Sequence, residues 1–183
     1  MKTTLYFIRH GELNNPQQVV YGQKIPLPLS KEGREEIKKL ALNFKKRGVV
    51  PKIIYSSPLK RTRQSTEEIL KVFPETPVIY RKDLQEVDLN WLTGKSLMWV
   101  RSLANAYACR GVEKPEKIIQ RMMRVIKLIL KKHRGQTVFV VSHGDPLSFI
   151  FWHLTYPKKP LPSVKQIKQK FLIPKGQAYK IVL

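Results

Sequence analysis

Two short apolar segments of this 183-residue chain are each followed, after one polar residue, by the dipeptide His-Gly. The first, residues 5–8, leads into Arg9-His10-Gly11-Glu12, and the second, residues 137–141, leads into Ser142-His143-Gly144. Apolar runs of this length are typical of buried strands, which have no structural use for a polar cluster at one end unless it faces a crevice. In open α/β sheets that crevice lies beyond the carboxyl ends of the strands. The repeated pattern therefore predicts a site at the edge of a sheet.

Strands and helices alternate along most of the chain. Because alternating units of this kind form a parallel sheet with helices on both faces, we expect an α/β fold, a three-layer α/β/α sandwich with a mainly parallel sheet. A chain of 183 residues fills one core and is too short for two ordinary domains, so we expect a single domain over residues 1–183. The predicted strands are 3–8, 52–55, 78–80, 137–141 and an antiparallel 177–182; the predicted helices are 31–46 (after an N-cap at Ser30), 58–72, 96–108, 115–133, 146–154 and 164–171.

The composition excludes several classes of protein. Cys109 is the only cysteine, which excludes an intramolecular disulfide and any cysteine-rich metal site. At the amino terminus the apolar run ends after a few residues at Arg9, so neither a signal peptide nor a transmembrane span is supported. We expect a cytoplasmic protein in a reducing compartment, without a membrane partner.

The formal net charge of +22 raises the attraction of the chain to any polyanion without choosing among phosphorylated substrates, nucleic acid and acidic lipid. Lysine and arginine are scattered over all the predicted helices except 146–154, which favours solvated helix faces over a dedicated nucleic-acid stripe. We therefore expect no specific nucleic-acid partner. The last 38 residues, 146–183, carry seven lysines and no acid, which predicts a local positive field there.

A parallel sheet would bring three strand ends to one edge, since residues 52–55 are followed by a Ser-Pro turn that leads to Arg61. The groups gathered there are two imidazoles, two guanidiniums and the helix-start amides after Gly144, with Glu86 available from a nearby loop. Guanidinium groups and helix N-terminal amides match the oxygens of a transferring phosphoryl group. A neutral imidazole can attack phosphorus, and a protonated carboxyl can give its proton to the leaving alkoxide. Cationic side chains supply the charge in this scheme, and HxH and HExxH motifs are lacking, so we expect no metal and no other cofactor.

Four motifs, in order, resemble the histidine phosphatase superfamily in its phosphoglycerate mutase-like branch. They are Arg9-His10-Gly11-Glu12, Ser57-Pro58-Leu59-Lys60-Arg61-Thr62-Arg63-Gln64-Ser65, Leu84-Gln85-Glu86 and Ser142-His143-Gly144, and the similarity extends from residue 5 to about residue 150. The resemblance implies that His10 is the phosphorylated nucleophile and Glu86 the proton donor. It also implies a phosphate pocket made by Arg9, Arg61 and His143, next to the amides that follow Gly144.

Some positions depart from the pattern of this family. Leu13 stands where a threonine is common, Pro26 where an aspartate is common, and Leu92-Thr93 replaces an aromatic and acidic pair. Asn90 stands where a glycine is usual, an exchange we expect to be tolerated because asparagine accepts left-handed backbone better than most residues. These departures bear on the identity of the substrate and leave the five residues of the chemistry untouched.

The cap segment, defined here as residues 95–117, decides between hydrolysis and a mutase reaction. Mutases of this branch carry a long insertion between the acid and the second histidine, whereas here Glu86 and His143 are 57 positions apart by subtraction. A short cap favours access of water and hence hydrolysis. Four residues of the cap segment either select the leaving group or only pack over the sheet, and the sequence favours neither role: Trp99, Arg101, Tyr107 and Arg110.

Three functions are compatible with these patterns. The favoured function is that of a metal-independent phosphatase that hydrolyses a phosphomonoester of a small metabolite through phospho-His10. The alternatives are a phosphoglycerate mutase and a non-catalytic module that binds phosphate or polyanions. The sequence leaves the substrate open, because the same phosphate pocket is compatible with phosphoserine, a phosphosugar, α-ribazole phosphate, phosphoglycerate and a phosphohistidine protein.

Overall fold

The computed structural model describes residues 1–103 and 105–183 and is built around one five-stranded sheet. Its strands are β1 (Thr4–Arg9), β2 (Ile53–Ser56), β3 (Val78–Tyr80), β4 (Thr137–Ser142) and β5 (Ala178–Val182), in the spatial order β3-β2-β4-β1-β5. The first four are parallel, and β5 runs antiparallel to β1. All five predicted strands, including the antiparallel last one, are confirmed.

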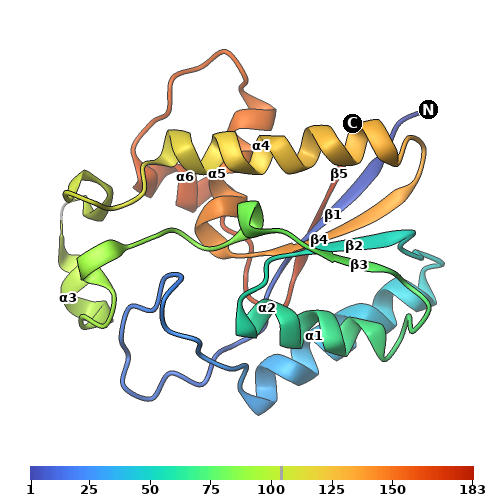
Figure 1. Ribbon diagram of the computed structural model, residues 1–183, viewed down its shortest axis with the longest axis horizontal. Coiled ribbons are helices and arrows are strands. Elements are labelled where there is room, and N and C mark those ends of the chain that lie inside the picture. Colours follow the sequence, from blue (N-terminus) through green and yellow to red (C-terminus); the bar gives the residue numbers. More distant parts are fainter. Residues whose placement is uncertain (104) are drawn as a thin grey trace.

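Helices cover both faces of this sheet, which confirms the three-layer sandwich (Figure 1). The helices α1 (Lys31–Lys46) and α2 (Lys60–Leu70) pack on one face. The other face is covered by α4 (Pro115–Lys132), α5 (Gly144–Thr155) and α6 (Val164–Phe171). Ser30 caps α1 as predicted, since its side chain accepts a hydrogen bond from the Gly33 N–H at 3.1 Å. Gly48 follows the end of α1 with a φ of 68°, where an L side chain would be strained.

The central strands are apolar on both faces because both faces are covered. In β1, Leu5 and Phe7 belong to the core beneath α4 and α5, whereas Tyr6 and Ile8 belong to the core beneath α1 and α2. All four side chains are almost fully buried. Continuous apolar runs of this kind are typical of parallel sheets, so the polar residues begin only where the strands leave the layers.

The predicted helix 96–108 is wrong as a continuous element. The structure has α3 (Leu97–Ser102) and the single 3₁₀ turn η3 (Ala106–Ala108), with Leu103 between them in extended conformation. Ser96 and Asn105 each accept a hydrogen bond from the backbone two or three residues on, which starts a new turn instead of continuing the helix. Ala104 lies outside the described residues.

Smaller differences concern the start of one helix and the structure of the loop after β3. The helix predicted from Pro146 begins at Gly144, because proline is tolerated in a first helical turn where its missing N–H is not needed. The loop after β3 forms the 3₁₀ turns η1 (Lys82–Leu84) and η2 (Asn90–Leu92). Asn90 has a φ of 50°, so the expectation of left-handed backbone at this position is confirmed. Among the described residues, no helix is both long and apolar enough to cross a membrane.

Candidate active site

The carboxyl ends of β1, β2 and β4 meet at one edge because these strands are neighbours in the parallel part of the sheet. His10 follows β1, and His143 follows β4 and serves as the N-cap of α5. The two imidazole rings lie edge to face with their centroids 5.3 Å apart. One ligand-type atom from each of His10, Glu86 and His143 lies within 4.8 Å of the others. The three titratable groups predicted to work together are therefore adjacent.

His10 is fully buried, and its two ring nitrogens have different surroundings. Nδ1 lies 2.8 Å from the carbonyl oxygen of Gly11, which can only accept a hydrogen bond, so Nδ1 carries the proton. Nε2 is buried and has no hydrogen-bond partner in the described chain. Burial, followed by the positive charge of Arg61, lowers the pKa of His10 well below its ordinary value. The imidazole is therefore neutral at neutral pH, with a free lone pair on Nε2.

Arg61 and His143 form a hydrogen-bonded pair in the floor of the site. Arg61 Nε donates to His143 Nδ1 at 3.1 Å, which places the proton of this ring on Nε2, 2.8 Å from the Ser57 hydroxyl. Burial and the charge of Arg61 lower the pKa of His143 well below its ordinary value. Arg61 also donates from Nη2 to the Gly22 carbonyl at 2.9 Å and lies 4.8 Å from the ring centroid of Tyr21. Its Nη1 keeps unused hydrogen-bonding capacity at a fully buried position.

Arg9 lies across the start of α5. Its Nη1 donates to the carbonyl oxygen of Ile173 at 2.8 Å, while its Nε has no partner among the described residues. A Cβ on Gly144 would lie only 2.9 Å from the Cζ of Arg9. Gly144 therefore allows the guanidinium to lie against the first turn of the helix, where its cationic group adds to the free amides.

The loop that carries Glu86 is held by one buried arginine of α4. Arg121 Nη1 donates to the carbonyl oxygens of Asp83 and Gln85, both at 2.7 Å, and Nη2 donates to the Glu86 carbonyl at 3.1 Å. Its Nε and Nη2 also bind the Glu113 carboxylate, at 2.8 and 3.1 Å. The position of the Glu86 carboxyl group thus depends on an ion pair that lies behind the site.

The half-buried carboxyl group of Glu86 has a raised pKa. Burial is the largest cause and the negative charge of Asp145 is the second, while the positive charge of Arg61 acts in the opposite direction. Of its own contacts, Oε1 accepts a hydrogen bond from the Val87 N–H at 3.1 Å. A raised pKa lets the carboxyl group keep its proton to higher pH than an ordinary glutamate, which favours the role of proton donor.

The loop after β1 crosses α1 at very close range. A Cβ at Gly11 would overlap the backbone of Gly33, and a Cβ at Gly33 would overlap the backbone of Glu12. Glu12 itself accepts a hydrogen bond from Lys175, and its N–H donates to the Glu36 carboxylate at 2.9 Å. These contacts give Glu12 a role in supporting the loop. They also explain a glycine in the first turn of α1, where a capping box would have an acid.

A divalent cation is one possible ligand for the three adjacent groups His10, Glu86 and His143. Their surroundings fit this ligand poorly, because Nδ1 of His143 already accepts a hydrogen bond from Arg61 and the nearby guanidinium groups repel a cation. The unused donors of Arg9 and Arg61 fit an oxyanion instead. The expectation that no metal takes part stays a prediction.

The structure separates the four cap residues singled out in the sequence. Trp99 is 44% exposed, and Arg101 and Arg110 are also exposed. Tyr107 is buried, and its hydroxyl donates a hydrogen bond to the carboxylate of Asp145. Only Tyr107 therefore has a contact with the residues that surround the site.

Three residues that touch the site received no role from the sequence: Tyr21, Ser57 and Ile173. Ser57 belongs to one of the four motifs and directly follows β2, and this position could have identified it as a residue of the site. Tyr21 and Ile173 reach Arg61 and Arg9 from loops distant in the chain, and no local pattern marks them.

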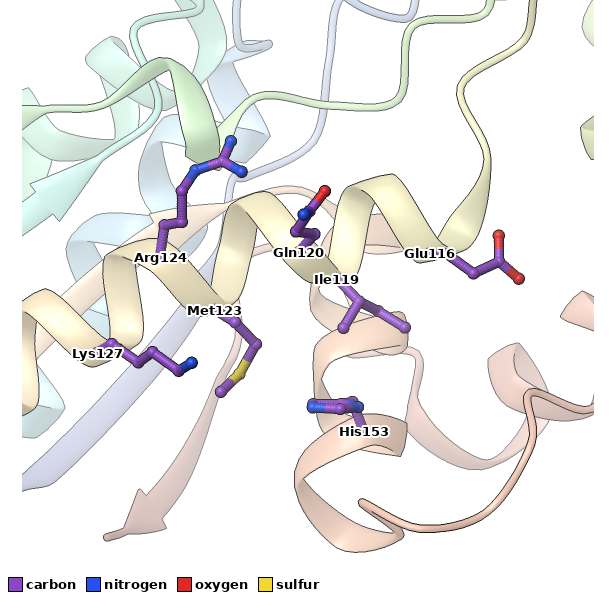
Figure 2. A pocket seen from close by; sticks show the side chains of 7 residues that line it. All are labelled: Glu116, Ile119, Gln120, Met123, Arg124, Lys127 and His153. Atoms are coloured by element: carbon purple, nitrogen blue, oxygen red, sulfur yellow. The ribbon is translucent and has the colours of Figure 1, made fainter.

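A separate hollow of about 450 Å³ lies between α4 and α5 and contains none of the residues of the candidate active site. Figure 2 shows Arg124 directed away from α5, and His153 of α5 beneath α4. Side chains of both charge signs line the hollow: Glu116, Ile119, Gln120, Met123, Arg124, Lys127 and His153. Six of these side chains belong to α4 and one to α5, and we assign no function to them.

The sandwich and its strand-end cluster define an α/β protein of the phosphoglycerate mutase-like fold. The profile of the histidine phosphatase superfamily, branch 1, matches residues 5–171, and the chain belongs to this family. The resemblance inferred from the four motifs is therefore confirmed.

Curated relatives include phosphatases and a mutase. A metal-independent phosphoserine phosphatase from Arabidopsis thaliana is 30% identical over 84% of this chain and 69% of its own length. A 2,3-bisphosphoglycerate-dependent phosphoglycerate mutase from Bartonella bacilliformis is 28% identical over 80% of this chain and 79% of its own length. A Schizosaccharomyces pombe protein named as a probable phosphatase is 29% identical over 89% of this chain, which spans only 61% of that protein.

Solved structures share the fold at lower identity. YhfR of Bacillus stearothermophilus matches with a TM-score of 0.83 at 23% identity, covering 97% of this chain and 90% of that one. An Entamoeba histolytica phosphoserine phosphatase in complex with 3-phosphoglyceric acid matches with a TM-score of 0.76 at 18% identity, covering 97% and 89%. Together the relatives support a phosphatase, and the fold is that of the family.

Proposed function

We propose that the protein is a metal-independent phosphatase that hydrolyses a phosphomonoester of a small metabolite through a phosphohistidine at His10, with Glu86 as proton donor. One observation carries the proposal. Nε2 of His10 is a buried, unprotonated nitrogen without a hydrogen-bond partner among the described residues, next to guanidinium donors with unused capacity. A nucleophile and the counter-charges for a phosphoryl group therefore lie in one place.

In the first half-reaction, the lone pair of His10 Nε2 attacks phosphorus and the bond from phosphorus to the ester oxygen breaks. Arg9, Arg61, the Nε2–H of His143 and the amides after Gly144 stabilise the negative charge on the other phosphoryl oxygens. Glu86 gives its proton to the leaving alkoxide, so the alcohol departs neutral. The products of this half-reaction are phospho-His10, the alcohol and a Glu86 carboxylate.

In the second half-reaction, water attacks the phosphorus of phospho-His10 while the Glu86 carboxylate accepts a proton from that water. The N–P bond breaks, its electron pair returns to Nε2 of His10, and inorganic phosphate leaves. Both halves use the same carboxyl group in opposite protonation states. The enzyme thereby returns to its starting state without any further reactant.

Turnover of p-nitrophenyl phosphate in excess EDTA tests the proposal. We expect His10→Ala to abolish phosphate release and to prevent formation of an acid-labile, alkali-stable phosphoenzyme in rapid-quench experiments with a ³²P-labelled phosphomonoester. His153→Ala is the matched control, because His153 is a half-buried histidine on α5 outside the candidate active site. Normal turnover by His10→Ala would refute the mechanism.

Hydrolysis is preferred over the mutase reaction on the length of the cap segment, which we propose to be residues 95–117. Because one of the curated relatives is a phosphoglycerate mutase, the mutase reaction is the second candidate function. Incubation with 3-phosphoglycerate separates the two functions, since a mutase forms 2-phosphoglycerate without net release of phosphate. We expect phosphate release from at least one member of a panel of phosphorylated metabolites and no isomerisation of 3-phosphoglycerate.

A further inference from the structure

Asp145 lies in the first turn of α5, directly after His143 and Gly144, and both of its carboxylate oxygens have partners. Oδ2 accepts a hydrogen bond from the hydroxyl of Tyr107 in the cap segment. Oδ1 lies 2.8 Å from Nζ of Lys168 in α6. A carboxylate with both oxygens engaged by protein groups is not available as a substrate ligand. It is instead a joint between three elements that are distant in sequence.

The cap side of this joint is well packed. Tyr107 is only 7% exposed and meets the ring of Phe149 edge to face at a centroid distance of 5.4 Å. Nζ of Lys114 donates to the Tyr107 carbonyl at 2.6 Å, and Nζ of Lys168 lies 6.0 Å from the centre of the Tyr107 ring. The hydroxyl–carboxylate contact is therefore the polar end of a buried, fixed side chain. The turn of the cap segment that carries Tyr107 cannot shift without breaking this contact.

We propose that Asp145 is a positioning residue of the phosphatase: it fastens the cap segment and α6 to the start of α5, beside the proton donor Glu86. The inference rests on the proposed function and extends it to residues outside the chemistry. It also gives a task to one lysine of the basic carboxyl-terminal stretch. Lys168 stabilises the carboxylate at Oδ1, the oxygen that Tyr107 does not bind, and the helix start adds favourable amide dipoles.

The joint also places a negative charge next to Glu86. This charge is the second largest cause, after burial, of the raised pKa of Glu86. In the described part of the chain, the other charged or titratable groups near Glu86 are the cations Arg61 and Arg9, the phenols Tyr21 and Tyr107, and the imidazoles of His10 and His143. Without the Asp145 charge, the positive charges of Arg61 and Arg9 dominate the electrostatic field at Glu86, so its pKa falls and the carboxyl group loses its proton at lower pH.

Asp145→Asn tests the effect of the Asp145 charge on Glu86 and the contribution of the joint, because the amide keeps the shape of the side chain and loses its charge. We expect the alkaline limb of the pH profile of kcat to move to lower pH. The loss of kcat relative to wild type should be roughly threefold or more larger at pH 8.5 than at pH 6. Tyr107→Phe removes only the hydroxyl, so it should raise KM several-fold and leave the alkaline limb in place. Lys168→Met should raise KM in the same way as Tyr107→Phe.

Two controls are matched to these variants. Glu116→Gln removes an exposed acid from the first turn of α4, and Lys165→Met removes an exposed lysine from α6. Neither should change the pH profile or KM. If the pH profile and KM of Asp145→Asn are identical to those of wild type, the inference is wrong.

A measurement without substrate separates this inference from the proposed function. Hydrogen–deuterium exchange of residues 105–112 should become at least several-fold faster in Tyr107→Phe than in wild type, because the hydroxyl that anchors the cap segment to Asp145 is lost. Unchanged exchange would overturn the joint even in an active enzyme. Faster exchange in a chain that releases no phosphate from any ester would support the joint and refute the proposed function alone.

Discussion

Replacement of Arg121 by methionine tests whether the loop of Glu86 is held from behind. Methionine fills much of the space of the arginine stem and removes all five of its hydrogen bonds. The carbonyl oxygens of residues 83, 85 and 86 lose their donors, and the Glu113 carboxylate is left without its counter-ion. The side chains of Arg121 and Glu113 are only 9% and 15% exposed, so water replaces these contacts poorly.

The expected cost follows from this burial. Breaking a buried ion pair on one side destabilises a protein by about 3–5 kcal/mol. With a urea m-value of about 2 kcal/mol per molar, the unfolding midpoint should fall by about 2 M. The activity of the remaining folded protein should show a lower kcat with little change in KM, since the arginine positions the proton donor and does not contact the phosphate pocket.

Arg124→Met is the matched control for this variant. Arg124 lies one helical turn further along α4 and binds the Asp83 carboxylate of the same loop at 2.6 Å. Figure 2 shows its side chain extending from the helix surface. Because Arg124 is 58% exposed, its loss should cost no more than about 1 kcal/mol. Equal shifts of the urea midpoint for the two variants, or an unchanged kcat for Arg121→Met, would refute the argument from burial.

Three further predictions concern the candidate active site. Gly33→Ala should lower the free energy of unfolding by about 1–3 kcal/mol and reduce kcat, because the new methyl group displaces the Glu12 backbone; urea denaturation and steady-state kinetics measure both effects. The pKa values of His10 and His143 are lowered in the folded state, so the stability they give is present above pH 6.5 and is lost as the pH falls; urea midpoints should decrease from pH 7.5 to pH 5, less steeply in His10→Gln. Glu86→Gln should slow alkyl phosphates by about 10²-fold or more and p-nitrophenyl phosphate much less, because nitrophenolate leaves without a proton; equal losses in a comparison of initial rates would contradict the role of Glu86.

Local patterns were sufficient to predict the strands and the groups at their ends. An apolar run that ends in His-Gly specifies both the buried strand and the polar group beyond it, since a buried strand excludes polar side chains. Once β1, β2 and β4 are parallel neighbours, His10, Arg61 and His143 must approach one another. The topology thus predicts that these residues are neighbours, although the particular hydrogen bond from Arg61 Nε to His143 Nδ1 is visible only in the structure.

Contacts between distant segments could not be predicted in this way. Arg9 binds the carbonyl oxygen of Ile173, and Arg61 binds that of Gly22, in loops without any local pattern. The predicted helix 96–108 failed for a related reason, because helix propensity does not reveal that Asn105 caps a new turn. The conformation of such segments depends on tertiary packing and on local side-chain caps, and the periodicity of apolar residues reports neither of them.

The high positive charge of the chain has a different meaning in different places, which the composition alone hides. Lys168 and Lys175 from the basic carboxyl-terminal stretch are paired with Asp145 and Glu12, so their charge is locally balanced. Within the described part of the chain, neither Arg9 nor Arg61 takes part in a salt bridge, although both are adjacent to the two histidines. These two lysines each have an acidic partner, whereas the guanidinium groups of Arg9 and Arg61 stay without one beside His10, and this contrast supports the proposed binding of a phosphoryl group at that place.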